Sequence, residues 1–337
     1  MKVLKIIGII LLIVIVLIIV LGLVAPKDYA VERTVIINAP KDLVFDHVKY
    51  WRNWKQWSPW AERDSMMKVT IEGVDGDSSS IYKWIGDPDI TGEGEMTNTG
   101  VKEGEEIAYH LHFIKPWESS SDGYLRVSED SSGTKAAWGF SGTNPFPWNV
   151  LFLFMSMDNM IGKDFDRGLE LLKTAAEKEE QAISSYEVKQ VEWRKQLYAA
   201  IRKEIPFDQI QSFFSEAYGQ IMQAIGSKGA RSVGAPVGIY FKWDMQKMTS
   251  DLAAAIPVNR AVELGNVKSI ELPAGTACVV DYYGPYAGIE PAHKALDRYI
   301  KQNMLIQNGP VIEEYITDPG AEPDTSNWLT RIYYFVE

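Results

Sequence analysis

The chain has 337 residues, of which 46% are hydrophobic and 23% charged, and its formal net charge is -11 at pH 7. This composition is rich enough in apolar side chains for folded cores, and the length suggests two domains, because one domain commonly holds ~100–200 residues. An acidic chain without a dense run of Lys and Arg lacks the basic face that neutralises phosphates, so we expect no nucleic-acid partner.

The first predicted element is a membrane-spanning helix. An uncharged run, mostly Ile, Leu and Val, extends from Ile6 to Pro26, and about 20 apolar residues match the hydrocarbon thickness of a bilayer. A cleaved signal peptide is the alternative, but its apolar region is usually ~7–15 residues long. Lys2 and Lys5 precede the run, so the positive-inside rule places the N-terminus in the cytoplasm. We therefore expect residues 1–27 to be a single-pass anchor in the cytoplasmic membrane, with the soluble domains outside, periplasmic or extracellular.

Segments that alternate between apolar and polar residues, as half-buried strands do, follow the anchor. They are AVERTVIINA, SSIYKWIG, EEIAYHLHFI and DGYLRVSE. Helices are predicted from Pro40 to about Trp54 and from about Trp148 to Lys178, the second because apolar residues recur there at steps of three and four. This order of a strand, a helix, several strands and a long helix indicates an α+β domain with a sheet curled around one helix.

The stretch WRNWKQWSPW, residues 51–60, places a tryptophan at every third position. In a helix, steps of three drift by about 60° around the axis, so we expect Trp54 and Trp57 to face different surroundings. Pro59 predicts that the helix ends at or before Ser58. A membrane-interface belt is disfavoured, because a predicted strand and most of a helix separate the run from the apolar span.

Residues Val31 to Lys178 resemble the START-like family, also called the polyketide-cyclase or SRPBCC superfamily. The segments that carry the resemblance are INAPKDLVFDHV, WKQWSPW, YKWIGDPDITGEGEMT and IGKDFDRGLELLK. The resemblance implies a helix-grip fold, in which a curved antiparallel sheet wraps the C-terminal helix and encloses an apolar cavity. It also implies that the tryptophan run closes one end of this cavity. Most of the run is then packing, and Trp57 and Trp60 are the candidate ligand contacts.

A polar stretch rich in Glu and Lys, TAAEKEEQAISS, predicts a domain boundary, with residues 179–185 as the linker. Two similar units follow it at an offset of about 75 positions. In the first, YEVKQVEWRKQLYAAIR precedes a helix and the strand GAPVGIYFKW; in the second, GNVKSIELPAGTACVVDYY precedes a helix and the strand NGPVIEEYIT. Each unit reads as one or two strands, a helix and a strand. Residues 186–337 are therefore expected to form a pseudo-twofold α+β domain that binds a ligand at the seam between its halves.

The same part of the chain, Tyr186 to Glu337, resembles the GyrI-like effector-binding domain, a small-molecule domain also attached to bacterial transcription activators such as those of the AraC type. The carrying segments are GAPVGIYFKWD, IPV, GNVKSIELPAG, YYGPY, VIEEYITDP and TRIYYFVE. In that family, the glutamate of an E-x-Y strand motif pairs with cationic ligands at the floor of an aromatic pocket. The matching positions here are Glu313 and Tyr315. The matched segments also contain the further candidate ligand-binding residues Tyr240, Trp243, Tyr283 and Tyr333.

The chain departs from this family at one place, since members often carry a histidine where Tyr282 stands. Strand geometry supports the rest of the assignment, because residues i and i+2 face the same side and Glu313 and Tyr315 therefore point together. Glu314 is expected to share the other face with Ile312. A carboxylate beside aromatic faces attracts an organic cation through Coulomb and cation–π interactions, whereas the alternative is that Glu313 lies on a solvated face.

Motifs of common enzymes are absent from the sequence, including G-x-S-x-G, the P-loop, G-x-G-x-x-G after a strand and H-E-x-x-H. His110 and His112 share one strand face, but no third ligand follows with recognisable spacing, so we expect no metal. The single cysteine, Cys278, excludes an intramolecular disulfide and a multi-cysteine metal site. His47 and His293 are expected to be structural or exposed.

The sequence thus favours non-catalytic binding of small hydrophobic or cationic molecules near a membrane, by a sensor or carrier that needs no cofactor. By resemblance, the alternative is a hydrolase of reactive small molecules that uses Glu313 with Tyr283 or Tyr315 as acid and base. A structural or interaction protein is a third hypothesis, and the sequence indicates no particular protein partner. Gene regulation is disfavoured because no basic helix-turn-helix accompanies the effector domain.

Overall fold

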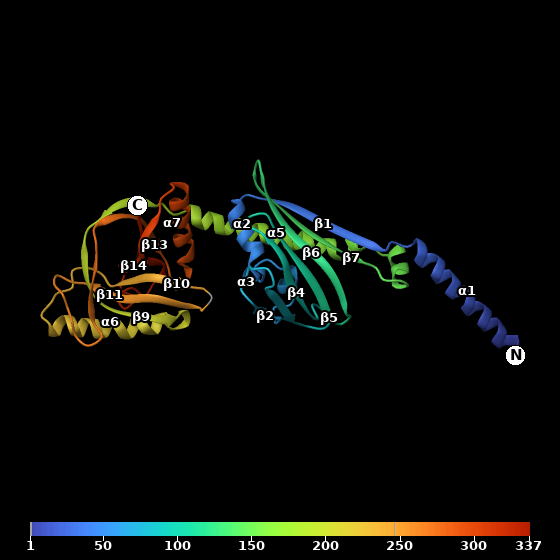
Figure 1. The fold of residues 1–337 in the computed structure, drawn as a ribbon, viewed down its shortest axis with the longest axis horizontal. Helices are drawn as coiled ribbons and strands as arrows, with labels where there is room; N and C mark the ends of the chain where they lie inside the picture. Colours follow the sequence, from blue (N-terminus) through green and yellow to red (C-terminus); the bar gives the residue numbers. More distant parts are fainter. Residues whose placement is uncertain (1, 246) are drawn as a thin grey trace. The chain divides into compact units, whose positions relative to one another are not determined.

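The computed structural model describes residues 2–245 and 247–337. The chain divides into two compact units, Met1–Glu180 and Gln181–Glu337 (Figure 1). The elements of the first unit are α1 (Lys2–Val24), β1 (Asp28–Ile37), α2 (Lys41–Lys49), α3 (Trp51–Trp54), α4 (Pro59–Arg63), β2 (Lys68–Glu72), β3 (Ile81–Ile85), β4 (Glu93–Lys102), β5 (Glu106–Lys115), β6 (Ser119–Asp130), β7 (Gly133–Thr143), the 3-10 helix η1 (Trp148–Leu153) and α5 (Met157–Ser184).

Helix α1 is apolar apart from Lys2 and Lys5 at its beginning. The stretch Lys5–Val24 has a mean hydropathy of 3.7, and nearly all of its side chains are exposed. A helix of this length and composition fits either a membrane anchor or a signal sequence.

The first unit is an antiparallel sheet of seven strands in the order β1-β7-β6-β5-β4-β3-β2. Helix α5 supplies Phe165, Leu169 and Leu172, which are almost fully buried. The ring of Trp138 on β7 stacks on Phe165 at 4.4 Å, with 3° between the ring planes. The predicted α+β arrangement, a curled sheet around one helix, is confirmed.

The long helix differs from its prediction at both ends. Residues 148–153 form the separate 3-10 helix η1, and α5 begins only at Met157. The buried side chain of Asn149 in η1 donates a hydrogen bond of 2.7 Å to the Gly22 carbonyl at the end of α1. At the other end α5 continues to Ser184, so residues 179–185, expected as a linker, are helical up to that residue. Glu, Gln and Ala in this stretch favour a helix, and Ile183 is buried.

The tryptophan run is also broken into short pieces, because Tyr50 is extended (φ -93°, ψ 118°) and α3 ends at Trp54. The expectation that Trp54 and Trp57 face different surroundings is therefore wrong. Their ring centroids lie 4.7 Å apart, and both rings pack against Trp138. Ser58 caps α4, which Pro59 begins.

The second unit contains β8 (Lys189–Trp193), β9 (Gln196–Pro206), η2 (Phe207–Gln209), α6 (Ile210–Ser227), β10 (Val237–Asp244), β11 (Thr249–Pro257), β12 (Lys268–Leu272), β13 (Gly275–Tyr283), η3 (Tyr286–Gly288), α7 (Glu290–Gln302), β14 (Gln307–Tyr315), η4 (Thr325–Asn327) and β15 (Leu329–Val336). Two strands, a helix and two strands thus occur twice in chain order. The sheet order is β12-β9-β11-β10-β14-β15-β13-β8, all antiparallel. It reads the same from either edge when β8–β11 are exchanged with β12–β15, as a pseudo-twofold domain requires.

Both helices of the second unit pack on one face of its sheet. Ile221 of α6 and Leu296 of α7 are fully buried there. The opposite face carries a separate apolar cluster that includes Tyr198, Ile312 and Phe335. Strands β10 and β14 pair at the centre of the sheet, at the seam between the two halves.

Candidate functional site

A buried carboxylate lies at the seam of the second unit. Glu313 is on β14, opposite Gly238 of β10, and is only 7% exposed. Its Oε2 accepts hydrogen bonds from the hydroxyl of Tyr315 at 2.9 Å and from the hydroxyl of Tyr240 at 3.1 Å. Its Oε1 lies 3.1 Å from Nε2 of His293 on α7. Side chains from β10, β14 and α7 therefore converge on one carboxylate.

His293 connects this carboxylate to a third tyrosine, since its Nδ1 lies 3.1 Å from the hydroxyl of Tyr334 on β15. A neutral imidazole that donates from Nε2 to Glu313 and accepts at Nδ1 from Tyr334 satisfies both contacts. No Lys or Arg in the described part of the chain pairs with Glu313. Among the described residues, His293 is the one basic side chain that contacts the carboxylate, and its ring compensates the charge of Glu313 only when protonated.

Of the two alternatives expected for His293, structural or exposed, the structure favours the first, because its side chain is only 18% exposed and contacts Glu313. Its position contained a usable signal. His293 lies four residues after Ile289 and three before Leu296, so it belongs to the stripe of α7 that faces the sheet. A polar residue in such a stripe requires a partner in the core.

Aromatic rings surround the Glu313 carboxylate. The ring of Trp243 stacks on Tyr240 at 4.7 Å, and Phe214 of α6 lies edge-on to both Tyr240 and Tyr315. The hydroxyl of Tyr218 is buried and has no hydrogen-bond partner among the described residues. Burial and the negative charge of Glu313 hold the pKa of Tyr218 well above its usual value. A buried phenol without a partner is a donor available to a ligand.

The close packing of these rings requires glycine at position 238. A Cβ built on Gly238 would lie 2.9 Å from the ring of Phe214 and 2.9 Å from the hydroxyl of Tyr315. Any side chain there would push the aromatic residues away from the carboxylate.

The structure brings together four of the residues singled out from the sequence, Glu313, Tyr315, Tyr240 and Trp243. Tyr283 is not with them: its side chain is 62% exposed, and it is the preceding residue, Tyr282, that points inward and donates to the Pro285 carbonyl at 2.6 Å. The ring of Tyr286 from the next turn lies 5.4 Å from that of Tyr315. Sequence reasoning did not identify His293, Tyr286, Tyr218 or Phe214 as site residues.

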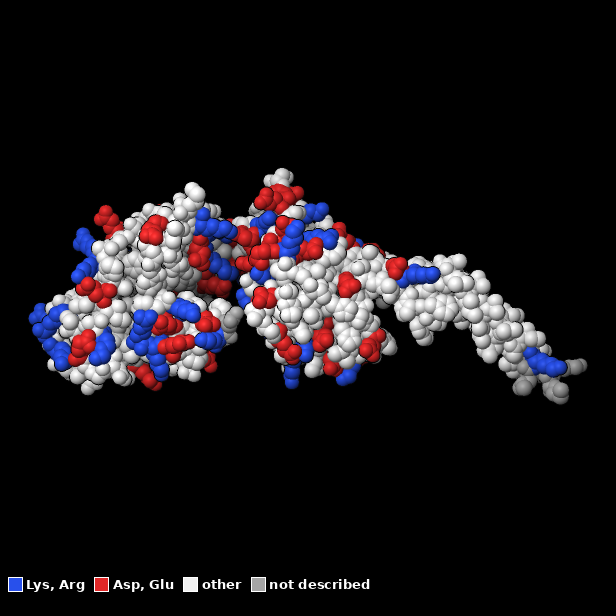
Figure 2. Space-filling model, viewed as in Figure 1, with Lys and Arg blue, Asp and Glu red and all other residues white. Residues whose placement is uncertain are grey.

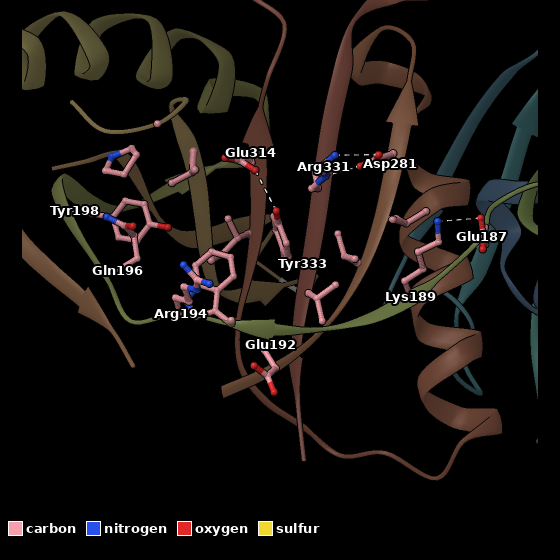
Figure 3. Close-up of a pocket in the computed structure, with 18 of the residues that line it drawn as sticks. Glu187, Lys189, Glu192, Arg194, Gln196, Tyr198, Asp281, Glu314, Arg331 and Tyr333 are labelled. Atoms are coloured by element: carbon pink, nitrogen blue, oxygen red, sulfur yellow. Dashed lines mark hydrogen bonds and ion pairs between the residues drawn. The ribbon is translucent and has the colours of Figure 1, made fainter. Parts of the chain in front are cut away.

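Tyr333 lies on the opposite face of the sheet, in a groove of about 720 Å³ (Figure 3). Its hydroxyl donates to Glu314 at 3.2 Å, so the two consecutive glutamates face opposite sides, as strand geometry predicts. Burial and the Glu314 carboxylate raise the pKa of Tyr333 to about 12. Beside them, Arg331 forms a two-pronged ion pair with Asp281.

The first unit encloses a smaller cavity of about 120 Å³, lined mainly by aromatic residues that include Trp54, Trp60, Trp84, Tyr109, Trp138 and Phe165. The structure places Trp60 in the lining. Trp57 is fully buried beside it, and its indole N–H donates to the His47 carbonyl at 3.1 Å. Since ligand sites commonly measure ~300–1,000 Å³, this conformation of the cavity holds only a small molecule.

The histidines His110 and His112 each face their own carboxylate, Asp122 at 2.8 Å and Glu118 at 3.4 Å. Within residues 2–245 and 247–337, no group of three or more His, Cys, Asp and Glu side chains is placed to hold a metal ion.

Comparison with known proteins identifies a family for each unit. Residues 186–336 match the family described as GyrI-like small molecule binding domain. Residues 29–177 match the family described as polyketide cyclase / dehydrase and lipid transport. No curated protein matches the chain.

Several solved structures are similar to part of the chain. The EcmrR C-terminal domain is 22% identical, with 45% of this chain and 98% of that chain covered and a TM-score of 0.39. A hydrolase encoded by lin2189 from Listeria innocua is 13% identical, with coverages of 48% and 97% and a TM-score of 0.34. Ara h 8.0201 is 12% identical, with coverages of 44% and 97% and a TM-score of 0.33.

Proposed function

Because the chain joins a domain of the polyketide cyclase and lipid transport family to a GyrI-like small-molecule-binding domain, we propose that it binds small molecules without transforming them. The second unit takes an organic cation at Glu313, and the first unit takes an apolar ligand beside Trp60. Helix α1 anchors the chain in the cytoplasmic membrane, where the protein acts as a sensor or carrier.

The observation that carries this proposal is the buried Glu313 carboxylate, which two tyrosine hydroxyls and the His293 ring contact and with which no Lys or Arg of the described residues pairs. Water solvates such a charge poorly at 7% exposure, so a cation that reaches it gains more Coulomb energy than it would at a surface. The surrounding rings of Tyr240, Trp243 and Tyr286 add cation–π attraction, which is worth ~0.5–2 kcal/mol per well-placed ring. An organic cation satisfies both features, whereas a small inorganic cation makes little use of the rings.

The test is calorimetric titration of the full chain in detergent with benzyltrimethylammonium, an aromatic cation, and with neopentylbenzene, its uncharged isostere. We expect the wild type to prefer the cation, and Glu313→Gln to lose at least ~10-fold in cation affinity, about 1.4 kcal/mol, with little change for the isostere. Glu314→Gln is the matched control, because it removes the same charge from the adjacent residue on the opposite face. Equal cation affinity of Glu313→Gln and the wild type would refute the role of Glu313.

One observation favours a second function, hydrolysis of a reactive electrophile. Glu313, His293 and Tyr315 are within hydrogen-bond distance as an acid–base group requires. The carboxylate would take a proton from a water molecule that attacks an epoxide carbon, while a tyrosine hydroxyl would give its proton to the epoxide oxygen. We expect no turnover of styrene oxide above the buffer rate. Turnover that Glu313→Gln abolishes would replace the binding function by a hydrolase.

The proposed membrane location rests on α1. Among the described residues, other parts of the chain pack only against the C-terminal end of this helix, and the rest of its apolar surface is exposed. We expect the mature protein to keep residues 1–27, which mass spectrometry of the purified chain will show. Protease added to spheroplasts should digest both units if they lie outside the cytoplasmic membrane. Protection of the units until the spheroplasts are lysed would contradict this orientation.

A further inference from the structure

An uncharged segment forms an exposed apolar surface at the end of the first unit that adjoins α1. Residues 144–157 contain no Asp, Glu, Lys or Arg. Trp148 is 66% exposed and Phe154 83% exposed. We define the apolar collar as the six exposed large side chains of this segment: Phe146, Trp148, Leu151, Leu153, Phe154 and Met155. Single exposed apolar residues are ordinary, but six within ten positions mark an interaction surface.

The collar is fixed to the last turn of α1. Asn149 is buried, and its Nδ2 donates to the carbonyls of Gly22 at 2.7 Å and Ala25 at 3.4 Å. The ring of Phe146 lies so close to Gly22 that a Cβ there would be 2.6 Å from it. If α1 spans a bilayer, its last turn lies where the helix leaves the hydrocarbon core, and the collar lies at the same depth. Tryptophan, as at position 148, is enriched at that depth in membrane proteins.

The same end of the sheet holds one end of the cavity of the first unit. Strand register shows this. β1 begins at Asp28 opposite Thr143, the end of β7, just before the collar. Antiparallel pairing of β7 with β6 and of β6 with β5 brings the end of β5, Lys115, and its partner Glu93 to the same end of the sheet. Trp117, in the turn after β5, is 80% exposed. Ile90 and Phe113, also at this end, line the cavity, and Ile90 is half exposed, so the lining reaches the surface here.

Charged side chains are sparse around the collar itself, where Figure 2 shows a largely white surface next to α1. At the rim of the same end, Asp87 and Asp89 precede Ile90, and Lys115 and Glu118 flank Trp117. The nearest acidic residue after the collar, Asp158, is neutralised by an ion pair of 2.8 Å with Arg33. Lys27 and Asp28 follow α1 and offset each other. The surface therefore suits the interfacial layer of a bilayer rather than an acidic or basic protein partner.

We propose that the apolar collar and Trp117 insert into the interfacial layer of the bilayer that α1 spans, so that the Ile90 end of the cavity faces the membrane. The inference rests on the proposed membrane anchoring. An apolar ligand then passes between the bilayer and the cavity without crossing water. Because the collar is attached to α1 directly, the anchor holds the cavity at the membrane surface and does more than tether it.

The experiment uses the full chain in phosphatidylcholine nanodiscs, with an environment-sensitive NBD label on a single cysteine and with lipids that carry a nitroxide quencher on the acyl chain. Buried Cys278 is replaced by Ala throughout. The labelled positions are Trp148→Cys and Phe154→Cys in the collar, and Ile90→Cys at the cavity end. Leu12→Cys on α1 reports the anchor, and Ser131→Cys, in the turn between β6 and β7 at the other end of the sheet, reports the aqueous side.

We expect the labels at 148, 154, 90 and 12 to shift to shorter emission wavelengths and to lose most of their fluorescence to the nitroxide, while the label at 131 does neither. If the label at position 12 is quenched but the labels at positions 148 and 154 are not, the collar insertion is overturned and the anchor stands. If the label at position 12 is not quenched, both the anchor and the collar insertion are overturned. Quenching at 148 and 154 without quenching at 90 would overturn the orientation of the cavity.

Discussion

His293 Nε2 lies 3.1 Å from Glu313 Oε1, and this contact joins helix α7 to the central strand of the second unit. The other ring nitrogen of His293 holds Tyr334 on β15. One imidazole therefore orients the carboxylate from the side of the helix, while Tyr240 and Tyr315 orient it from the sheet. A carboxylate fixed from both sides is preorganised, so a bound cation does not have to order it.

The first prediction concerns this imidazole. His293→Phe fills a similar space but leaves Oε1 of Glu313 without its donor, and an unsatisfied buried group costs ~1–3 kcal/mol. We expect the free energy of unfolding in urea to fall by that amount. Tyr283→Phe, at an exposed position of the same unit, should change it little. Equal stability of the two variants would show that water replaces the histidine.

The contact also shows what the sequence can and cannot predict about this site. The opposite orientations of Glu313 and Glu314 follow from the period of two in a strand, which a single segment contains. The Glu313–His293 pair joins residues on different elements, 20 positions apart, and its geometry depends on how α7 packs on the sheet. Periodicity, on which the expectation for His293 did not rest, is enough to place this residue on the core side of its helix, but it does not reveal the partner of His293.

The prediction for the tryptophan run is wrong for a related reason. The sequence predicts a helix that continues from Pro40 to about Trp54, whereas the chain breaks at Tyr50 and again after Trp54. The break turns Trp51, Trp54 and Trp57 into one core, which Trp138 completes from β7. The fold class needed only the order of strands and helices, so it was predictable, but a break that is stabilised by distant packing was not.

The second prediction separates packing from ligand contact in that run. Trp57 is fully buried and lies outside the cavity lining, whereas Trp60 is partly exposed and lines the cavity. Trp57→Ala should lower the free energy of unfolding by ~3–5 kcal/mol, as large core truncations do. Trp60→Ala should lower it less and should mainly weaken binding of a small apolar probe, such as 1-aminonaphthalene, followed by its fluorescence. The reverse ranking in the urea titration would contradict this division of roles.

The third prediction concerns alkaline stability of the first unit. Burial raises the pKa of Tyr82 to about 12, whereas a free tyrosine titrates at ~10. The unfolded chain therefore loses this proton near pH 10 and the folded chain near pH 12. Stability that is fully present below pH 10 is lost as the pH rises through this window, by ~2–3 kcal/mol in all.

Tyr82→Phe removes this titration. Its free energy of unfolding, measured in urea by tryptophan fluorescence, should at pH 8 differ from that of the wild type by no more than the removal of a buried hydroxyl usually changes it. Between pH 10 and 12 it should decline less steeply than that of the wild type. Parallel curves for the two proteins over this range would show that Tyr82 titrates normally.

The last prediction concerns the junction between α1 and the collar. The final four carbonyls of a helix have no partner inside the helix, and Asn149 supplies a donor to one of them, that of Gly22, at 2.7 Å. Asn149→Ala removes this donor, so the open state of the last turn of α1 should be more populated, and a loss of ~1.4 kcal/mol corresponds to a ~10-fold larger opening equilibrium constant. Hydrogen exchange of the Ala25 amide, which donates to Leu21, should accelerate by that factor in nanodiscs.

Cation binding at Glu313 should stay at the wild-type value, because the substitution lies in the other unit. Unchanged exchange at Ala25 would mean that the bilayer, and not Asn149, holds the end of α1 in place.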